Sequence, residues 1–276
     1  MVNDFNIHLY TKDAGSIDDQ IVEDTELRPE DLVSNLLRYK NHFNKSGVLQ
    51  ANFHLFNSYV LNINGFENFK KLVNKEFPGS TLTLLCDFRN ADIVKYLKAI
   101  KSKGFSFVKF HSYVQNITVK DFEKVVEVSI EAEKIGLGIC IDASYGTNKL
   151  YTNDNLAMAA QILNNVNGTP VVLLHSGGPR IFESMLLALQ NTNVYLETSL
   201  SLDFYEGSSL WKDYAYVYRR IGLDRILFAS DFPYQPVDEA IKTFSRFKEY
   251  LNMTEAELQL IRFQNFVNLK KLVCNT

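Results

Sequence analysis

The stretch RILFASDFPY, from Arg225 to Tyr234, decides the fold class of this chain. It opens with a short apolar run, typical of a buried strand in a parallel sheet, and continues with Asp231 and Pro233. Proline cannot donate a backbone hydrogen bond, so we expect the strand to end at the carboxylate. In an eightfold β/α barrel, such a strand end lies at the catalytic mouth. A turn in which Ser230 and Asp231 only bond the backbone explains this stretch alone equally well.

Eight strand-like runs occur along the 276 residues, and helical patterns separate most of them. The alternation predicts parallel strands joined by crossover helices, and the count of eight predicts a closed barrel. We therefore expect one α/β domain, a (β/α)8 TIM-type barrel over residues 1–276. The predicted strands are Phe5 to Leu9, Val48 to His54, Thr81 to Asp87, Ser106 to His111, Leu137 to Asp142, Pro170 to His175, Val194 to Thr198 and Arg225 to Ser230.

Helix start and stop signals lie between these strands. Thr118 with Asp121, and Thr254 with Glu257, have the spacing of capping boxes. The expected helices run from Pro29 to about Asn44, from a cap at Asn90 to Gly104, from Thr118 to Gly136 and from Thr254 to about Leu272. The longest segment without periodicity, Tyr10 to Arg28, is a candidate lid over the mouth.

Composition limits the partners and the compartment. Net charge is -3 with both signs interspersed, which predicts neither a nucleic-acid partner nor binding to an anionic membrane. No apolar run approaches the roughly 20 residues that span a bilayer, and the N-terminus lacks the features of a signal peptide. Three scattered cysteines are too few for a disulfide framework, and Cys86 and Cys140 lie in apolar runs that place them in the core. We expect a soluble, reduced, cytoplasmic protein.

Polar side chains collect at the predicted strand ends. A single histidine there is more often structural than functional, but four of the five histidines fall at strand ends, which favours function. We interpret His54 and Asp87 as structural, and expect Lys109 to pair with a carboxylate. The polar strand-end residues are Asn6, His8, His54, Asp87, Lys109, His111, Asp142, His175, Glu197 or Thr198, and Asp231.

A glycine turn follows the sixth strand. The sequence SGGPR, Ser176 to Arg180, directly precedes a predicted helix. Gly177 and Gly178 would let backbone N–H groups approach an anion, to which Arg180 adds charge. The alternative is that the two glycines only make a tight turn.

Four motifs in matching order resemble those of one family. They are FVKFH at strand four, VVLLHSGG at strand six, GLDRILFASDFPY at strand eight, and the region of Asn265 and Phe266. Together they resemble the amidohydrolase-related branch of the amidohydrolase superfamily, and the resemblance covers essentially the whole chain. That branch includes metal-dependent hydrolases and nonoxidative decarboxylases.

The resemblance implies a site for one divalent metal ion. Carried over position by position, the ligands are Asn6, His8, Asp142 and Asp231, with His175 nearby to orient substrate or water. Asn6 and Asp142 stand where the family has histidines. Losing two imidazoles to oxygen donors lowers the preference for zinc and suits manganese or magnesium. With zinc kept as an alternative, the expected cofactor is one divalent metal ion, zinc or manganese.

A metal-free site is the alternative. Asp142 and Asp231 facing one another in a dry mouth would repel, so a positive charge should lie between them. That charge is either the metal ion or the ammonium of Lys109. The resemblance allows both, because some members of the wider family hydrolyse lactones without metal.

The leading functional hypothesis is a hydrolase acting on a small amide, ester or lactone. Asp231 would be the general base, a metal ion or Lys109 would polarise the carbonyl, and His175 would orient the water or leaving group. His111, Arg180, Gly177 and Gly178 would contact the small-molecule substrate. The alternatives are a nonoxidative decarboxylase on the same site, or a barrel without chemistry that acts as a ligand-binding or interaction protein. Neither the substrate nor the oligomeric state can be read from the sequence.

Overall fold

The computed structural model describes residues 1–9, 29–56, 58–62, 65–145 and 148–274. The segment from Tyr10 to Arg28, predicted as a candidate lid, lies outside the described residues. So does the side chain of Cys274.

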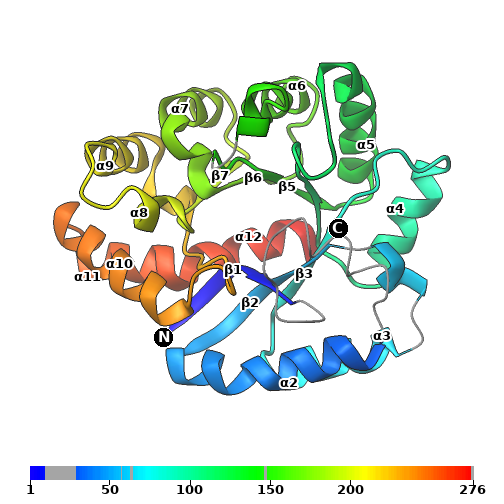
Figure 1. Cartoon of the computed structure of the whole chain (residues 1–276), viewed down its shortest axis with the longest axis horizontal. Coiled ribbons are helices and arrows are strands. Elements are labelled where there is room, and N and C mark those ends of the chain that lie inside the picture. The colour runs from blue at the N-terminus through cyan, green and yellow to red at the C-terminus, as the bar shows by residue number, and fades with distance from the viewer. Residues whose placement is uncertain (10–28, 57, 63–64, 146–147, 275–276) are drawn as a thin grey trace.

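Eight parallel strands form one sheet in chain order, with β1 beside β2 and so on to β8. Figure 1 shows the strands curling into a ring with the helices outside it, which confirms the predicted (β/α)8 barrel. All the residues of β1 are buried, because one face of the strand points into the barrel and the other packs under helices. The strands are β1 Val2–His8, β2 Val48–Leu55, β3 Thr81–Leu85, β4 Phe107–Phe110, β5 Gly138–Asp142, β6 Val171–Leu174, β7 Val194–Glu197 and β8 Ile226–Leu227.

Strand β8 is shorter than the predicted run from Arg225 to Ser230. Past Leu227 the backbone donors turn to other partners: the Ala229 N–H donates to Thr198 Oγ1 and the Ser230 N–H to Asp4 Oδ1. Side chains therefore replace ladder bonds there. The seam with β1 is completed by backbone bonds, such as that from the Asp231 N–H to the Asn6 carbonyl at 2.8 Å, which hold Asp231 at the mouth as predicted.

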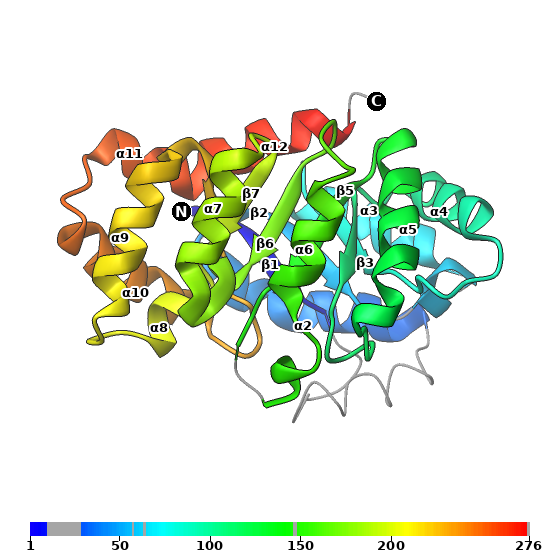
Figure 2. The same ribbon diagram turned by 90° about the horizontal axis from the view of Figure 1, so that it is seen from above.

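The helices cover the outside of the ring, except that α12 lies across one end of the strands (Figure 2). Phe266, Leu269 and Val273 of α12 join the inward-facing Phe5 and other strand residues in the barrel interior. The helices are α2 Pro29–Ser46, α3 Phe66–Glu76, α4 Ile93–Ser102, α5 Phe122–Lys134, α6 Asn155–Leu163, α7 Ile181–Gln190, α8 Ser201–Phe204, α9 Leu210–Ile221, α10 Val237–Tyr250, α11 Glu255–Gln259 and α12 Asn265–Cys274.

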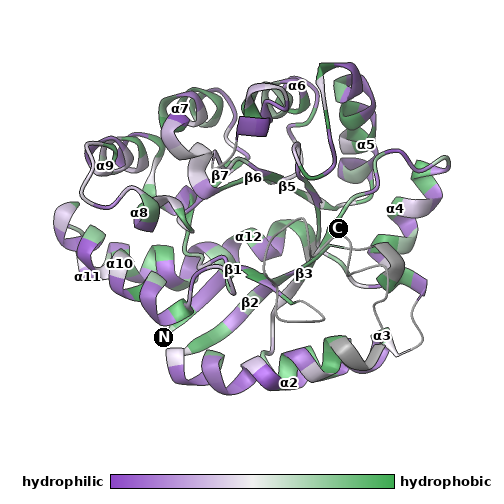
Figure 3. Ribbon diagram, in the orientation of Figure 1, coloured by the Kyte–Doolittle hydropathy of each residue, from purple (hydrophilic) through white to green (hydrophobic). Residues whose placement is uncertain are grey.

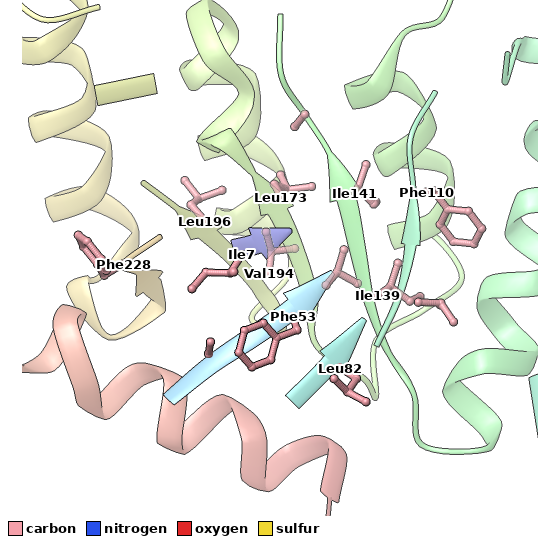
Figure 4. Packing of buried hydrophobic residues seen from close by; sticks show 14 of the residues in the cluster. Ile7, Phe53, Leu82, Phe110, Ile139, Ile141, Leu173, Val194, Leu196 and Phe228 are labelled. Atoms are coloured by element: carbon pink, nitrogen blue, oxygen red, sulfur yellow. The ribbon is translucent and has the colours of Figure 1, made fainter. Parts of the chain in front are cut away.

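A second, larger apolar layer lies between the strands and the surrounding helices. Figure 4 shows side chains such as Ile7, Ile141 and Leu173 in this layer, and Figure 3 shows the strands largely green among helices that are in part purple. Cys86 and Cys140 are fully buried, as predicted. The two apolar layers thus hold the strands in place. The polar residues at the strand ends lie at the end of the barrel opposite α12, where they form a site.

Two of the predicted helix boundaries need correction. The capping boxes at Thr118 and Thr254 are present. The cap of α4 is Asp92 instead of Asn90, because the Asp92 side chain accepts from the Lys95 N–H while Asn90 accepts only from Asp92. The predicted last helix is divided into α11 and α12 by a π turn at Leu260–Gln264. Among the described helices, none is long and apolar enough to cross a membrane.

Candidate active site

Five of the predicted site residues, from five different strand ends, line one cavity of about 260 Å³. They are His8, Lys109, Asp142, His175 and Asp231, and the remaining wall is formed by Tyr113, Ser144, Leu200 and Tyr234. Segments far apart in the sequence therefore bring their titratable groups together at the carboxyl ends of the strands, where parallel strands of a barrel converge.

Asp231 is held through one of its two carboxylate oxygens. Oδ1 accepts from Asn6 Nδ2 at 2.8 Å and lies 3.0 Å from His8 Nε2. Burial raises the pKa of Asp231 to about 6, although the nearby His175 and Lys109 act in the opposite direction. Burial, assisted by Lys109, keeps the pKa of His8 well below its usual range, so His8 is a neutral donor to the carboxylate. Asp231 is thus a positioned carboxylate that exchanges its proton near neutrality.

Asp142 is surrounded by nitrogen atoms. Its Oδ2 lies 3.1 Å from Lys109 Nζ, 3.3 Å from His111 Nε2 and 3.4 Å from His175 Nε2. Ser144 Oγ donates to the other oxygen at 2.6 Å. Burial favours the neutral acid, but these nitrogen groups outweigh it and hold the pKa of Asp142 well below its usual range. Asp142 is therefore an anion at neutral pH and holds Lys109 in the cavity wall.

His175 lies between two carboxylates. Its Nε2 faces Asp142, and its Nδ1 lies 3.0 Å from Ser199 Oγ and 3.5 Å from Glu197 Oε1. Burial alone would lower the pKa of His175, but the facing Asp142 raises it to about 9, with Asp231 and Glu197 acting in the same direction. At neutral pH the ring is an imidazolium, and each nitrogen has an acceptor to which it can donate.

The backbone around the cavity is strained. His175, Leu200 and Asp231, all on the cavity wall, have φ of 59°, 54° and 63°, and Ser176 has 53°. Positive φ is costly for residues other than glycine and persists only where surrounding bonds enforce it. Glu197 Oε1 provides one such bond by accepting from the His175 N–H at 2.6 Å. Strain of this kind gathers at functional sites, which supports this cavity as one.

Asp4 is a supporting residue that the sequence analysis missed. Its Oδ1 accepts from the backbone N–H groups of Ser230 at 3.0 Å and Asn6 at 3.1 Å, and so joins the ends of β1 and β8 behind Asp231. Burial raises its pKa to about 7. The available signal was its place two residues before Asn6, on the same inward face of a strand. Ser144 and Ser199 were also missed, and they carry no comparable signal.

Four predicted substrate contacts are not among the residues that line this cavity. His111 is fully buried against Asp142 and Tyr113 and is not among the residues that line the cavity. Gly177 packs on α7, where an added Cβ would overlap Ser184 Oγ. Gly178 lines a small neighbouring cavity of about 100 Å³. Arg180 bonds Asp154 at 2.8 Å and also pairs with Glu183, and it lines a separate cavity of about 450 Å³.

The predicted metal ligands do not fit a resident divalent ion. Among the described side chains, no three from His, Cys, Asp and Glu are grouped to hold a metal ion. Asp231 Oδ1 takes bonds from Asn6 and His8 directly, and Asp142 faces Lys109. An ammonium group at this place repels a second cation and supplies the positive charge that two buried carboxylates require.

This arrangement defines a class of protein: a barrel with a cluster of charged and hydrogen-bonding groups in a cavity at its carboxyl-terminal mouth. A family model for the amidohydrolases matches residues 95–265, more than half of the chain. The chain therefore belongs to the amidohydrolase family. No curated protein matches it.

Solved structures share the fold along the whole chain at low sequence identity. An uncharacterised TIM-barrel protein from Bordetella bronchiseptica has 15% identity and a TM-score of 0.71, with 99% of each chain covered. A probable 2-pyrone-4,6-dicarboxylic acid hydrolase from Acinetobacter baumannii, with citric acid bound, has 14% identity and a TM-score of 0.62, with 98% of each covered. A dihydroxybenzoic acid decarboxylase from a Polaromonas species, with bound manganese and 2-nitroresorcinol, has 14% identity and a TM-score of 0.64, with 99% and 98% covered. At these identities the likeness shows the fold alone.

Proposed function

We propose that this chain hydrolyses a small lactone, ester or amide, with Lys109 in place of a metal ion as the positive charge at the site. The observation that carries the proposal is that Lys109, His175 and Asp231 line one cavity, while Asp142 holds the lysine at 3.1 Å. A base, a cation and an acid in one cavity are the groups that acyl hydrolysis needs. Membership of the amidohydrolase family supports the same reaction class.

Asp231 is the proposed general base. Because Asn6 and His8 both bond Oδ1, Oδ2 remains to accept a proton from a water molecule in the cavity. With a pKa of about 6, the carboxylate is charged at neutral pH and is still basic enough to take that proton. The water oxygen attacks the carbonyl carbon as its proton passes to Asp231.

Lys109 would then stabilise the tetrahedral intermediate, and His175 would protonate its leaving group. Lys109 has three N–H donors, so it can hold Asp142 and also donate to the oxyanion that forms from the carbonyl oxygen. When the bond from carbon to the leaving oxygen or nitrogen breaks, the imidazolium of His175 donates a proton to that atom. The proton gained by Asp231 restores the imidazolium through water, so the cycle closes with one water consumed.

The direct test uses protein dialysed against a chelator and a panel of small lactones, esters and amides, with acid release followed by a pH indicator. We expect turnover of at least one substrate that chelation leaves unchanged within about twofold, and a loss of about 100-fold or more in kcat for Asp231→Asn. Asp87→Asn is the matched control, because Asp87 is an exposed aspartate after β3 that accepts only a local turn bond. Stoichiometric metal, with activity lost on chelation, would contradict the metal-free site.

Nonoxidative decarboxylation is a second candidate on the same site. The imidazolium of His175 could donate its proton to the carbon from which carbon dioxide leaves, and Lys109 could hold the substrate oxygens. Release of carbon dioxide from hydroxybenzoic acids distinguishes this reaction, since hydrolysis releases none. Absence of both reactions over a broad panel, with a ligand still bound, would favour a binding protein instead.

A further inference from the structure

A second cavity adjoins the catalytic cavity. It has a volume of about 100 Å³ and shares Ser144, His175 and Leu200 with the catalytic cavity. Tyr145, Phe204 and Tyr205 are among the residues that complete its wall. A molecule reacting beside His175 therefore lies next to an opening that no step of the proposed hydrolysis uses.

The added wall of this apolar cavity is mainly aromatic. The rings of Phe204 and Tyr205 meet edge-on with centroids 5.0 Å apart. Phe204 is 76% exposed, which is unfavourable for a phenylalanine and places an uncovered ring at the rim of the cavity. An apolar group entering from the catalytic side would remove part of this surface from water and contact ring faces.

Leu200 forms the boundary between the two cavities. It has φ 54° and ψ −48°, a conformation that a leucine rarely adopts, and it directly precedes α8, which carries Phe204. The strained residue thus sets the direction in which α8 leaves β7. Because strain in a binding wall persists only when the surroundings enforce it, we read the placement of Phe204 and Tyr205 beside the catalytic cavity as a built feature.

From these observations we infer that the apolar cavity binds the non-reacting part of the substrate, and that this part is one aromatic ring or a short branched alkyl group. The inference rests on the proposed function for the position of the reacting carbonyl. An engineered protein cavity of about 150 Å³ holds benzene, so a cavity of about 100 Å³ accommodates a small ring only in part, with the remainder against Phe204. The substrate is thus polar at the end that meets Lys109 and apolar at the other.

The test compares δ-valerolactone with a phenyl-substituted δ-valerolactone in the wild type and in three variants. Phe204→Ala and Tyr205→Ala each remove one of the rings that line the apolar cavity, while Tyr216→Ala removes an exposed ring on α9 that does not line it. The readout is the ratio of kcat/KM for the phenyl lactone to that for the plain lactone. We expect a wild-type preference for the phenyl lactone that falls about tenfold in the first two variants and is unchanged in the third. Melting temperatures confirm folding.

A binding measurement separates this inference from the proposed function. Toluene binding is measured by ligand-observed NMR with the same proteins, and it should be weakened by Phe204→Ala and not by Tyr216→Ala. If lactones are hydrolysed but the ratio does not change, the inference is overturned while the proposed hydrolysis stands. If none of the lactones, esters and amides is hydrolysed, the hydrolase proposal fails, and the toluene result alone decides for or against the apolar cavity as a binding site.

Discussion

The ammonium group of Lys109 lies 3.1 Å from Oδ2 of Asp142, and each side chain is at most 3% exposed. A buried ion pair contributes little net stability, but each partner is costly without the other. Lys109 also lies 5.0 Å from the ring centroid of Phe56, which leaves the ammonium enclosed on that side. The pair therefore behaves as one unit of the site, and we expect removal of either charge to affect both the stability of the fold and the proposed reaction.

Replacing Lys109 with methionine should destabilise the protein by about 3 kcal/mol, because Asp142 would remain as a buried charge without its closest cation. Adding Asp142→Asn to that variant should recover at least half of the loss. Urea unfolding at neutral pH measures both. If the losses for Lys109→Met and for Asp142→Asn alone simply add in the double variant, the two side chains do not interact. Both variants that lack Lys109 should be inactive if Lys109 stabilises the oxyanion.

The pH dependence of kcat/KM should be bell-shaped. In the proposed mechanism Asp231 acts when deprotonated, so activity should rise as the pH increases through about 6. His175 acts when protonated, so activity should fall as the pH increases through about 9. The variant His175→Asn should be slow and should lose the alkaline limb. A wild-type profile that stays flat to pH 10, or an alkaline limb that survives in the variant, would remove His175 from the proton transfer.

Replacing Asp4 with alanine should lower kcat about tenfold or more with a smaller change in KM, because the N–H groups of Ser230 and Asn6 lose their acceptor and Asp231 shifts. Two unsatisfied buried donors should also cost about 2 kcal/mol or more in the free energy of unfolding. Asp4→Asn keeps an acceptor oxygen and should restore most of kcat. Failure of the asparagine to rescue would mean that the charge of Asp4, and not its bonding, is what matters.

The variant Asp4→Asn should also change how the free energy of unfolding depends on pH. The folded-state pKa of Asp4 is about 7, above its unfolded value, so the folded state binds the proton more tightly. Its contribution to stability is therefore fully present at low pH and is lost as the pH rises through 7. The neutral Asp4→Asn should become more stable relative to the wild type between pH 5 and pH 8, as measured by urea unfolding.

Gly177→Ala should be among the most destabilising glycine substitutions in the chain. Gly177 has φ +87°, and an added Cβ would overlap Ser184 Oγ. We expect a loss of about 2 kcal/mol or more in the free energy of unfolding. Gly207→Ala is the matched control, because Gly207 has φ +78° with nothing within 4 Å of an added Cβ, and so measures the backbone cost alone. Equal losses in the free energy of unfolding at the two positions would show that the Ser184 side chain moves aside at no cost.

Much of the fold was predictable from the sequence because apolar runs and helix signals alternate regularly. All eight predicted runs contain the observed strands or overlap them within a few residues. The predicted end of β8 was wrong because the backbone N–H groups that follow Leu227 donate to side chains from distant parts of the chain, those of Asp4 and Thr198.

The site residues at the strand ends were predictable from the sequence, but the positions of residues in the segments that follow the strands were not. His8, Lys109, Asp142, His175 and Asp231 meet because strands in a barrel deliver their last residues to one mouth. The direction of a side chain after the strand depends on backbone angles that composition does not reveal. Positive φ from His175 to Gly178 turns the chain, and Arg180 then faces Asp154 and Glu183 instead of the catalytic cavity.

The left-handed backbone at His175, Ser176, Leu200 and Asp231 has a consequence for how this barrel would respond to laboratory selection. Glycine accepts such angles more readily than the residues present. A screen for heat tolerance alone should therefore collect substitutions at this rim, and the hardier proteins it yields should be poor catalysts. At these four positions a substitution that raises thermal resilience should lower turnover. Substitutions in the strands beneath them should raise thermal resilience without that loss.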